Sequence, residues 1–400
     1  MNHNALYWIW LAGRPGLGPI NCRRLLEQFG SAEAVFEADA EALTRAGVTP
    51  AAGKVLADKD LTAARAVLEA CRTAGIRTLT LKDPAYPNRL RQIVDAPVVL
   101  YCGGSLPEQD SRPCIGLVGS RKADEAGLAA ARRLGWQIAG CGGVVVTGMA
   151  KGVDAMAARG ALEQGGTVIG VLGCGIDVVY PRENAALLRQ VREQGCLLSE
   201  YPPGTKPNAR HFPARNRIIS ALSDGVVVVQ ATAASGALIT ARWAADQGRD
   251  VFAVPGPAEA PLSRGCNQLL REGAILTESG WDVLREYEYR YPTAVREYHG
   301  RPPAAELSPA LKPEPQGRSV PQSKPVPAPR QEARRAPDLS GFSPDQQTIL
   351  RALEAGPMQL DELIHRTGLP AARILPQLTL LQMKKTIACQ PGKRYSILKP

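Results

Sequence analysis

Residues 114–121, CIGLVGSR, and residues 144–152, VVVTGMAKG, decide the fold of this chain. Each begins as a short run of mostly apolar residues and continues into a turn that contains glycine. Strands that are apolar on both faces are typical of parallel sheets, in which helices cover both sides. Ser120, Arg121 and Lys151 follow the two runs directly. The segments therefore predict parallel strands with polar and cationic side chains at their carboxyl ends, where such sheets bind ligands.

Short apolar runs of this kind alternate with alanine-rich stretches as far as about residue 289. The predicted strands are Cys114–Val118, Val144–Thr147, Val168–Leu172, Cys196–Ser199, Val226–Gln230 and Val251–Val254. The predicted helices are Ala123–Ala139, Val153–Gln164, Glu183–Gln194 and Ala237–Gln247. The alternation predicts an α/β domain over residues 114–289, with a doubly wound parallel sheet of the extended Rossmann-like type.

Four of the turns after the predicted strands have a composition that suits anions. They are Gly119-Ser120-Arg121, Thr147 to Gly152 with Lys151, Ser235-Gly236 and Pro255-Gly256. Each combines a glycine, which lets the backbone approach a ligand closely, with a hydroxyl, a cation or the start of a helix. One such turn is weak evidence, because strand-to-helix turns favour glycine and serine in any case. Several turns on one edge of a sheet indicate a polyphosphate ligand.

The segment 208–222 gathers cations around one aromatic ring. Its notable side chains are Arg210, His211, Phe212, Arg215 and Arg217, and no acidic residue falls between Tyr201 and Ser223. Cations can meet phosphates and an aromatic ring can stack on an unpaired base. The alternative is a solvated basic loop whose phenylalanine fills the core, since charge runs are commonly surface.

Length and composition indicate two or three domains and a polyanionic partner. The chain has 400 residues, of which 44% are hydrophobic, and a formal net charge of +10. Nine scattered cysteines and four dispersed histidines show no metal-binding or redox spacing, so we expect buried thiols, no metal site and no cofactor. The apolar run Ala5–Ala12 is too short for a membrane span or a signal peptide. We therefore expect a cytoplasmic protein without a membrane partner.

Two further domains flank the sheet. Residues 1–80 are predicted to be helical, with turns at Gly16–Pro19 and Arg45–Val48 that resemble helix-hairpin-helix (SAM-like) units. Such hairpins can hold a phosphate, and the alternative is a packing module without a ligand. Residues 81–113 are predicted to be a connector, in which Pro97–Tyr101 could form a strand.

The C-terminal part is predicted to hold a mobile, proline-rich linker over residues 290–338 and a winged helix over residues 339–400. Ser343 is a predicted helix cap, and Ile387–Ile397 a hairpin wing. The third helix of this domain offers mostly Arg373 and Gln377 for reading a base. This favours an accessory or protein-binding role over recognition of a duplex.

The motifs of the central region together resemble the Smf/DprA family, the DNA-processing protein A of bacterial natural transformation. The matching pieces are Gly119-Ser120-Arg121, Thr147–Ala150, Gly152-Val153-Asp154, Tyr180-Pro181, Ser199-Glu200, Phe212–Arg217, Ser235–Ala241, Pro255-Gly256 and Gly265–Leu270. They cover about residues 115–276. Ala158 stands where the family usually has a histidine, so no role of that imidazole is transferred.

This resemblance implies a homodimer that binds single-stranded DNA without sequence preference, protects incoming DNA and loads a RecA-type recombinase. It implies no catalysis. We expect the DNA-binding residues to be Gly119, Ser120, Arg121, Lys151, Arg210, Phe212, Arg215, Asn216, Arg217, Ser235 and Gly236. Of Arg215 and Arg217, one is expected to face DNA and the other to pair with an acidic residue such as Glu200 or Asp224. Asn216 is expected to fix the local backbone.

Two other functions are considered. Relatives with a similar sheet edge are phosphoribohydrolases that cleave nucleotides, but those need a catalytic glutamate after a Gly-Gly-x-Gly-Thr turn. The corresponding region here, Ala234–Ala241, has no acidic residue. The second alternative is a regulator that binds duplex DNA through the winged helix.

Overall fold

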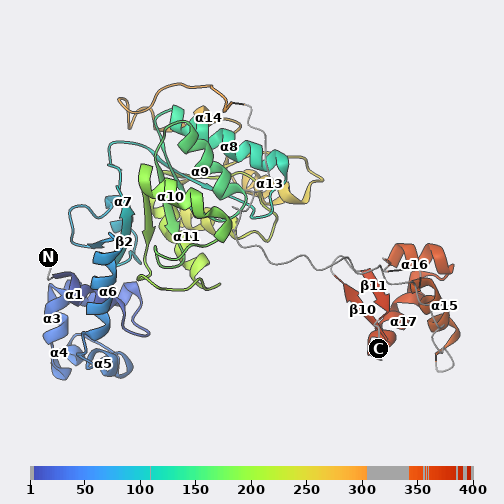
Figure 1. Cartoon of the computed structure of the whole chain (residues 1–400), viewed down its shortest axis with the longest axis horizontal. Coiled ribbons are helices and arrows are strands. Elements are labelled where there is room, and N and C mark those ends of the chain that lie inside the picture. The colour runs from blue at the N-terminus through green and yellow to red at the C-terminus, as the bar shows by residue number, and fades with distance from the viewer. Residues whose placement is uncertain are drawn as a thin grey trace, which may run out of the picture. The chain divides into compact units, whose positions relative to one another are not determined.

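The computed structural model describes residues 4–108, 110–303 and, between 342 and 397, all but residues 355, 357, 359, 384–385 and 391–393. The chain divides into two compact units, Met1–Leu311 and Lys312–Pro400 (Figure 1). From residue 304 onward, the predicted linker lies outside the described residues. In the part that is described, no helix is long and apolar enough to cross a membrane.

The first unit is built on a nine-stranded sheet with the order β1-β2-β6-β5-β4-β3-β7-β8-β9. Its strands are β1 (Arg77–Thr80), β2 (Val99–Gly104), β3 (Cys114–Val118), β4 (Val144–Thr147), β5 (Val168–Leu172), β6 (Cys196–Ser199), β7 (Gly225–Val228), β8 (Asp250–Ala253) and β9 (Ile275–Leu276). The strands from β6 to β9 in this order are parallel. Because β4 and β7 flank β3, the strand order reverses at β3, and doubly wound sheets form a binding crevice at such a switch point.

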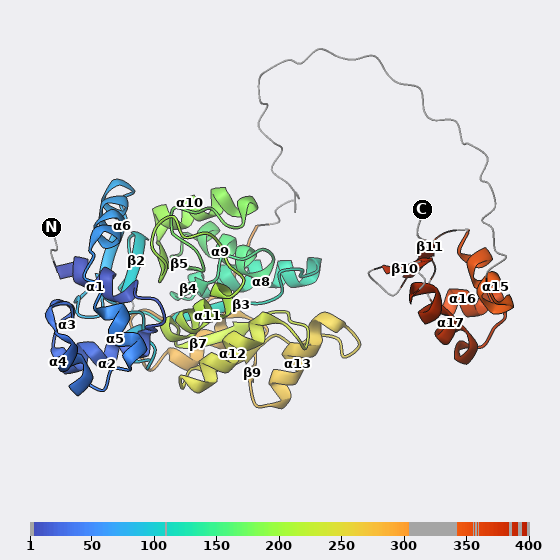
Figure 2. The same cartoon turned by 90° about the horizontal axis from the view of Figure 1, so that it is seen from below.

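Helices cover both faces of this sheet, as the apolar strands predict. One face carries α8 (Glu125–Gly140), α9 (Val153–Glu163), α10 (Ala185–Gln194) and α14 (Gly280–Leu284), and the other carries α7 (Asn88–Arg91), α11 (His211–Leu222), α12 (Gly236–Asp246) and α13 (Arg264–Arg271) (Figure 2). The predicted strands and helices agree with the observed ones to within two residues at each end.

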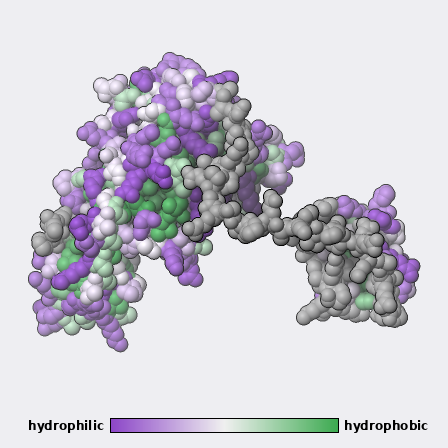
Figure 3. Space-filling model, in the orientation of Figure 1, coloured by the Kyte–Doolittle hydropathy of each residue, from purple (hydrophilic) through white to green (hydrophobic). Residues whose placement is uncertain are grey.

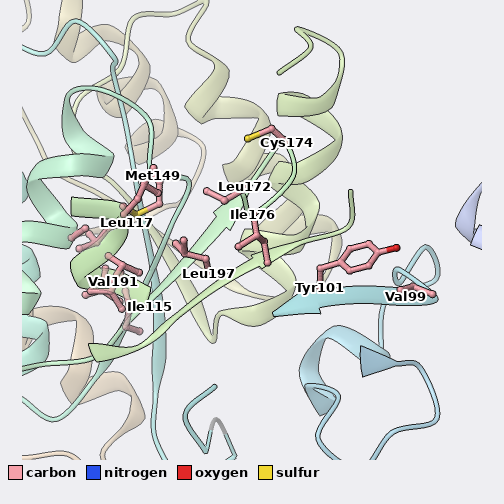
Figure 4. Packing of buried hydrophobic residues seen from close by; sticks show 14 of the residues in the cluster. Val99, Tyr101, Ile115, Leu117, Met149, Leu172, Cys174, Ile176, Val191 and Leu197 are labelled. Atoms are coloured by element: carbon pink, nitrogen blue, oxygen red, sulfur yellow. The ribbon is translucent and has the colours of Figure 1, made fainter. Parts of the chain in front are cut away.

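The two hydrophobic cores follow from the alternation of side chains along each strand. In β3, Ile115 and Leu117 belong to the core under α8 and α9, whereas Cys114 and Val118 belong to the core under α11 and α12. Figure 4 shows part of the first core, in which Met149 from the turn after β4 lies near Leu117. Burial of strand side chains on both faces holds the turns between strands and helices at fixed positions.

The N-terminal helices pack into the first of these cores. They are α1 (Asn4–Ala12), α2 (Pro19–Phe29), α3 (Ala32–Glu37), α4 (Ala40–Arg45), α5 (Pro50–Leu56) and α6 (Thr62–Thr73). Trp8 and Trp10 of α1 are buried in the same cluster as Val99 and Tyr101 of β2. Residues 77–80, predicted as part of the helical domain, form β1, and the predicted connector supplies β2. Both strands pair antiparallel and extend the sheet at one edge.

The chain just after residue 290 is packed, which corrects the predicted start of the linker. Tyr291 and Val295 are buried, and the backbone N–H of Arg296 donates to the carbonyl of Cys141 (3.0 Å). The Trp136 indole donates to the hydroxyl of Tyr298 (3.1 Å). The prediction is wrong for residues 291–298, because Tyr291 and Val295 are buried in the first unit and Tyr298 packs against α8.

The second unit contains α15 (Pro344–Leu353), α16 (Leu360–Thr367) and α17 (Ala371–Met383), followed by a hairpin of β10 (Ile387–Gln390) and β11 (Arg394–Ile397). Ser343 caps α15 and Pro344 occupies its first turn, as predicted. Three helices and an antiparallel hairpin are the predicted winged-helix arrangement.

Candidate nucleic-acid interface

A cleft of about 780 Å³ lies at the switch point of the sheet, where β3, β4 and β7 end. We call it the switch-point cleft. Its lining includes eight of the eleven residues predicted as a site from the sequence: Gly119, Ser120, Arg121, Phe212, Arg215, Asn216, Ser235 and Gly236. Segments that are more than a hundred residues apart in the chain thus converge on one cavity, as the rule for carboxyl ends of parallel strands predicts.

The turn after β3 is held by neighbouring backbone and leaves its arginine free to point outward. A Cβ on Gly119 would lie 2.7 Å from Val153 of α9, so glycine permits this close approach. The backbone N–H of Ser120 donates to the carbonyl of Gln230 (2.7 Å), and its hydroxyl accepts from the N–H of Lys122 (3.1 Å). Arg121 and Lys122 are exposed and line the cleft.

The turn after β4 forms the floor of the cleft around a buried carboxyl. Met149 has a positive φ of 56°, and Gly148 leaves room between the Arg215 guanidinium and Asp154, because a Cβ there would lie 2.6–2.7 Å from both. Burial raises the pKa of Asp154, while the nearby charge of Arg215 opposes that shift. Asp154 therefore orients the floor and is not accessible as a free acid at the surface.

The basic segment 208–222 forms a helix, α11, and not a loop. Pro213 lies in its first turn, where a missing N–H is tolerated. Arg215 and Arg217 are two positions apart and therefore point to opposite sides of the helix. Both side chains are buried, Arg215 in the lining of the switch-point cleft and Arg217 away from it.

Arg215 holds the ends of two strands together. Its Nη1 donates to the carbonyls of Gly148 (2.6 Å) and Val171. Burial lowers the pKa of Arg215 to about 10, and Asp154 opposes the shift. The arginine thus lies at the floor of the switch-point cleft, where carbonyl oxygens already satisfy its Nη1.

Arg217 is buried outside the cleft and is paired with two carboxylates. It lies 2.8 Å from Glu200 and 2.9 Å from Asp95, and it also donates to the carbonyl of Asp95. The predicted pairing of one arginine with Glu200 is confirmed. With two carboxylates and a carbonyl as partners, Arg217 ties α11 to the end of β6 and to the segment before β2.

An aromatic pair and a guanidinium stack at the mouth of the cleft. The Tyr180 and Phe212 rings stack with centroids 5.4 Å apart and planes inclined by 30°. The Arg121 guanidinium lies 5.0 Å from the centroid of the Phe212 ring. Phe212, the predicted stacking residue, is half-buried and already has two partners, whereas Tyr180 remains 37% exposed.

The turn after β7 closes the other side of the cleft. Ser235 caps α12 by accepting from the N–H of Ala237 (3.3 Å), and Gly236 is exposed with open space around its Cα. The amide of Asn216 donates to the carbonyl of Gly236 (3.4 Å) and its oxygen accepts from Arg215 (3.2 Å). Asn216 thus fixes the backbone between α11 and α12, the role predicted for it.

Besides Arg217, two predicted cations lie outside the lining. Lys151 is exposed and forms an ion pair with Glu183. Arg210 is exposed immediately before α11. Conversely, Lys122 and Tyr180 line the cleft and were not predicted as site residues. The scarcity of aromatic residues, 5% of the chain, could have drawn attention to Tyr180.

Figure 3 shows apolar side chains gathered over the region of α10 and α11, with hydrophilic side chains around them. No group of three or more potential metal ligands occurs among the residues that the structure describes. Ala158, at the position of the family histidine, is fully buried within α9.

Comparison with known proteins gives matches over most of the chain. The family described as DNA recombination-mediator protein A matches residues 77–288, and the DprA winged helix domain matches residues 326–393. Protein Smf of Synechocystis is 31% identical over 408 aligned residues, which cover 98% of this chain and 99% of that protein. DNA processing protein DprA of Streptococcus pneumoniae is 44% identical over 214 residues, covering 53% of this chain and 74% of that protein.

The X-ray structure of DprA from Streptococcus pneumoniae has the same architecture. It superposes with a TM-score of 0.62 at 36% sequence identity, and the match covers 70% of this chain and 97% of that chain.

Proposed function

Because the chain belongs to the family of DNA recombination-mediator protein A, we propose that its switch-point cleft binds single-stranded DNA without sequence preference. The observation that supports this most is the stack of Arg121, Phe212 and Tyr180 at the mouth of the cleft. A cation beside an exposed aromatic face offers a contact for a phosphate and a contact for the adjacent base. Relatives of this chain are named DNA processing proteins, which is the class of activity that such a site serves.

The exposed cations supply the phosphate contacts in this proposal. Arg121 and Lys122 line the cleft, and Arg210 stands free immediately before α11. Each phosphate contact adds about 0.7 to the slope of log affinity against log salt concentration for a single strand. One contact thus strengthens binding about fivefold at 0.1 M salt relative to 1 M salt. Useful affinity requires several contacts, or a second copy of the site in a homodimer.

An unpaired strand fits the site better than a duplex. Base stacking on Tyr180 requires a base whose face is accessible, and this is not the case in a double helix. The polar side chains deeper in the cleft are held by the protein: Asn216 by Gly236, Arg215 by strand carbonyls and Ser235 by the α12 backbone. They are not free to read base edges, which supports binding without sequence preference.

We further propose that the protein works in the cytoplasm as a homodimer, protects the strand and hands it to a RecA-type recombinase without chemical catalysis. Family membership supports the recombinase and the dimer. The lack of an acidic residue in Ala234–Ala241, where phosphoribohydrolases need a catalytic glutamate, supports the absence of catalysis.

In this proposal the winged-helix domain has an accessory role. Its most polar recognition-helix residue, Arg373, forms a two-pronged ion pair with Asp345 of α15. Gln377 accepts a hydrogen bond from Gln346, which also belongs to α15. Both residues that could read a base are thus turned to contacts inside the domain, which favours a protein partner over the major groove.

A mobility-shift comparison of single and double strands at two salt concentrations tests the proposal. We expect tighter binding of the single strand, and a loss of about fivefold at 0.1 M salt for Arg121→Ala with a slope shallower by about 0.7. Arg159→Ala on α9 removes the same charge from an exposed position outside the cleft lining and should match the wild type. If the protein instead prefers the duplex, and this preference disappears when residues 338–400 are removed, the protein is a regulator that binds duplex DNA through its winged helix.

A further inference from the structure

We propose a second anion-binding cleft that holds backbone phosphates of the same DNA strand. It lies at the edge of the sheet formed by β1 and β2. This inference rests on the proposed function. The cleft has a volume of about 830 Å³ and lies where β1 and β2 meet α10. We call it the edge cleft. Its lining is Gly75, Arg77, Gly104, Ser105, Leu106, Arg189, Arg192 and Glu193.

The edge cleft contains three arginines, and none of them forms an ion pair among the described residues. Arg192 donates to the carbonyls of Ala74 (2.5 Å) and Gly75 (3.5 Å) at the end of α6. Arg77 lies 3.5 Å from the carbonyl of Gly104 and 3.5 Å from the sulfur of Cys102. Carbonyl and thiol partners orient these guanidinium groups without the full negative charge of a carboxylate.

Arg189 is the most available of the three. It is exposed on α10, and within the described part of the chain no hydrogen bond or ion pair engages its side chain. It precedes Arg192 by three residues, so the two lie on the same side of the helix. Glu193 is the only acidic residue in the lining, and the cleft therefore keeps a net charge of two positive units.

Two glycines at the end of β2 bring these arginines over the sheet. Gly104 has a φ of 98°, and a Cβ on it would overlap the carbonyl oxygens of Arg192 and Gly195. A Cβ on Gly103 would lie 3.1 Å from Ile176 and 3.4 Å from the Arg192 Nε. A side chain at Gly104 would push the end of α10 away, and one at Gly103 would crowd Ile176 and the Arg192 side chain, so the glycine pair lets the helix and its arginine lie close to the strand end.

The edge cleft is separate from the switch-point cleft. Gly104 lies opposite Cys196, the first residue of β6, which places the edge cleft at the amino end of that parallel strand. The switch-point cleft lies at the carboxyl ends of β3, β4 and β7. Four strand spacings, from β2 to β3, and one strand length separate them, a straight-line distance of roughly 24 Å. A strand that reaches both must also pass around the covering helices.

The composition of the edge cleft indicates phosphates as its ligand. Guanidinium groups match phosphate oxygens in a two-pronged geometry. The lining has no aromatic residue for a base and one large apolar residue, Leu106, which gives a peptide little to bury. Contacts to the phosphates alone would hold the part of the DNA strand that extends beyond the switch-point cleft, whatever its base sequence.

The test compares a short oligonucleotide of about 5 residues, which fits one cleft, with one of about 40 residues, which spans both. The variant Arg77→Ala/Arg189→Ala leaves the structural contacts of Arg192 in place, and Arg159→Ala is the charge-matched control. For two lost phosphate contacts, we expect the long strand to bind roughly 25-fold more weakly at 0.1 M salt, with a slope shallower by about 1.4. The short strand should bind the alanine variant as tightly as the wild type. The variant Arg77→Lys/Arg189→Lys should restore most of the salt dependence of binding to the long strand.

Each outcome decides between the two proposals. If the alanine variant matches Arg159→Ala on the long strand, the edge cleft binds no DNA and the switch-point proposal stands. If the alanine variant binds the short and the long strand more weakly by the same factor, the two arginines act at the switch-point cleft, and the proposal of a second cleft is wrong. If the wild type binds neither strand, the proposed function itself fails. A melting temperature unchanged by the substitutions, which are on exposed side chains, verifies that the comparison is made on folded protein.

Discussion

Arg121 and Arg215 both line the switch-point cleft, yet their replacement by alanine should have different consequences. Arg121 is exposed, so Arg121→Ala removes a contact to DNA and leaves the fold unchanged. Arg215 is buried, and its removal leaves the carbonyls of Gly148 and Val171 without a donor. It also leaves the buried Asp154 without its nearest cation. The first substitution is predicted to affect binding and the second to affect stability.

The size of the stability loss follows from the burial of the Arg215 side chain. Breaking one side of a buried, hydrogen-bonded charge arrangement costs about 3–5 kcal/mol. In a domain of this size, 1 kcal/mol corresponds to ~2–4 °C, so the melting temperature should fall by roughly 6–20 °C. Arg121→Ala should melt within about 1 °C of the wild type, since exposed substitutions change stability little.

The pH dependence of the loss identifies its cause. Burial raises the pKa of Asp154, so this carboxyl destabilises the fold when it is ionised and does not when it is protonated. Removing Arg215 raises that pKa further. The stability gap between Arg215→Ala and the wild type should therefore be largest at neutral pH and narrow as the pH falls toward the raised pKa of Asp154.

Chemical denaturation at several pH values, together with fluorescence anisotropy of labelled single strands well below the melting temperature, measures both effects. A result in which Arg215→Ala is as stable as the wild type and binds DNA as poorly as Arg121→Ala would refute this reasoning. It would mean that Arg215 faces the strand and that its contacts to the β4 and β5 ends are dispensable.

Three further substitutions test other parts of the structure. Tyr180→Ala should lower single-strand affinity by about 1–3 kcal/mol with an unchanged salt slope, and Tyr180→Phe should keep it, because stacking does not involve counterions. Lys151→Ala should leave binding within about twofold of the wild type in the same titration, because Glu183 already pairs with the lysine at the surface. Gly104→Ala should destabilise the fold in thermal melts by more than Gly165→Ala, since both have positive φ but only Gly104 lacks space for a methyl group.

Much of the sheet could be predicted because each strand is encoded locally. Runs such as Val144–Thr147 are apolar on both faces and are followed by glycine, and this predicts their length, their parallel arrangement and the edge at which their turns gather. The two antiparallel strands, β1 and β2, were harder to predict. The apolar run Pro97–Tyr101 indicates a possible strand, but only the structure shows that β2 (Val99–Gly104) pairs antiparallel with β6. Nothing in the local sequence specifies which edge of a sheet an added strand joins.

The direction of individual side chains was the main limit of the sequence-based site. The basic segment correctly marked α11 as part of the cleft, through Phe212 and Asn216. It could not show that Arg217 turns inward, because its partners Asp95 and Glu200 lie 122 and 17 residues away in the chain. A count of charges on a segment does not distinguish a cation that is free from one whose charge is already compensated.

The same limit explains why the edge cleft is not evident from the sequence. Arg77 and Arg189 lie in different elements, 112 positions apart, and neither belongs to a basic run. They meet because Gly104 allows the end of α10 to lie against the end of β2. Net charge indicates that a polyanion is bound, but the location of its contacts depends on which arginines lack carboxylate partners. In the described part of this chain, Arg121 and Arg189 are exposed and form no ion pair, whereas Arg217 is compensated. The two clefts that contain the first two are therefore where a DNA strand should be held.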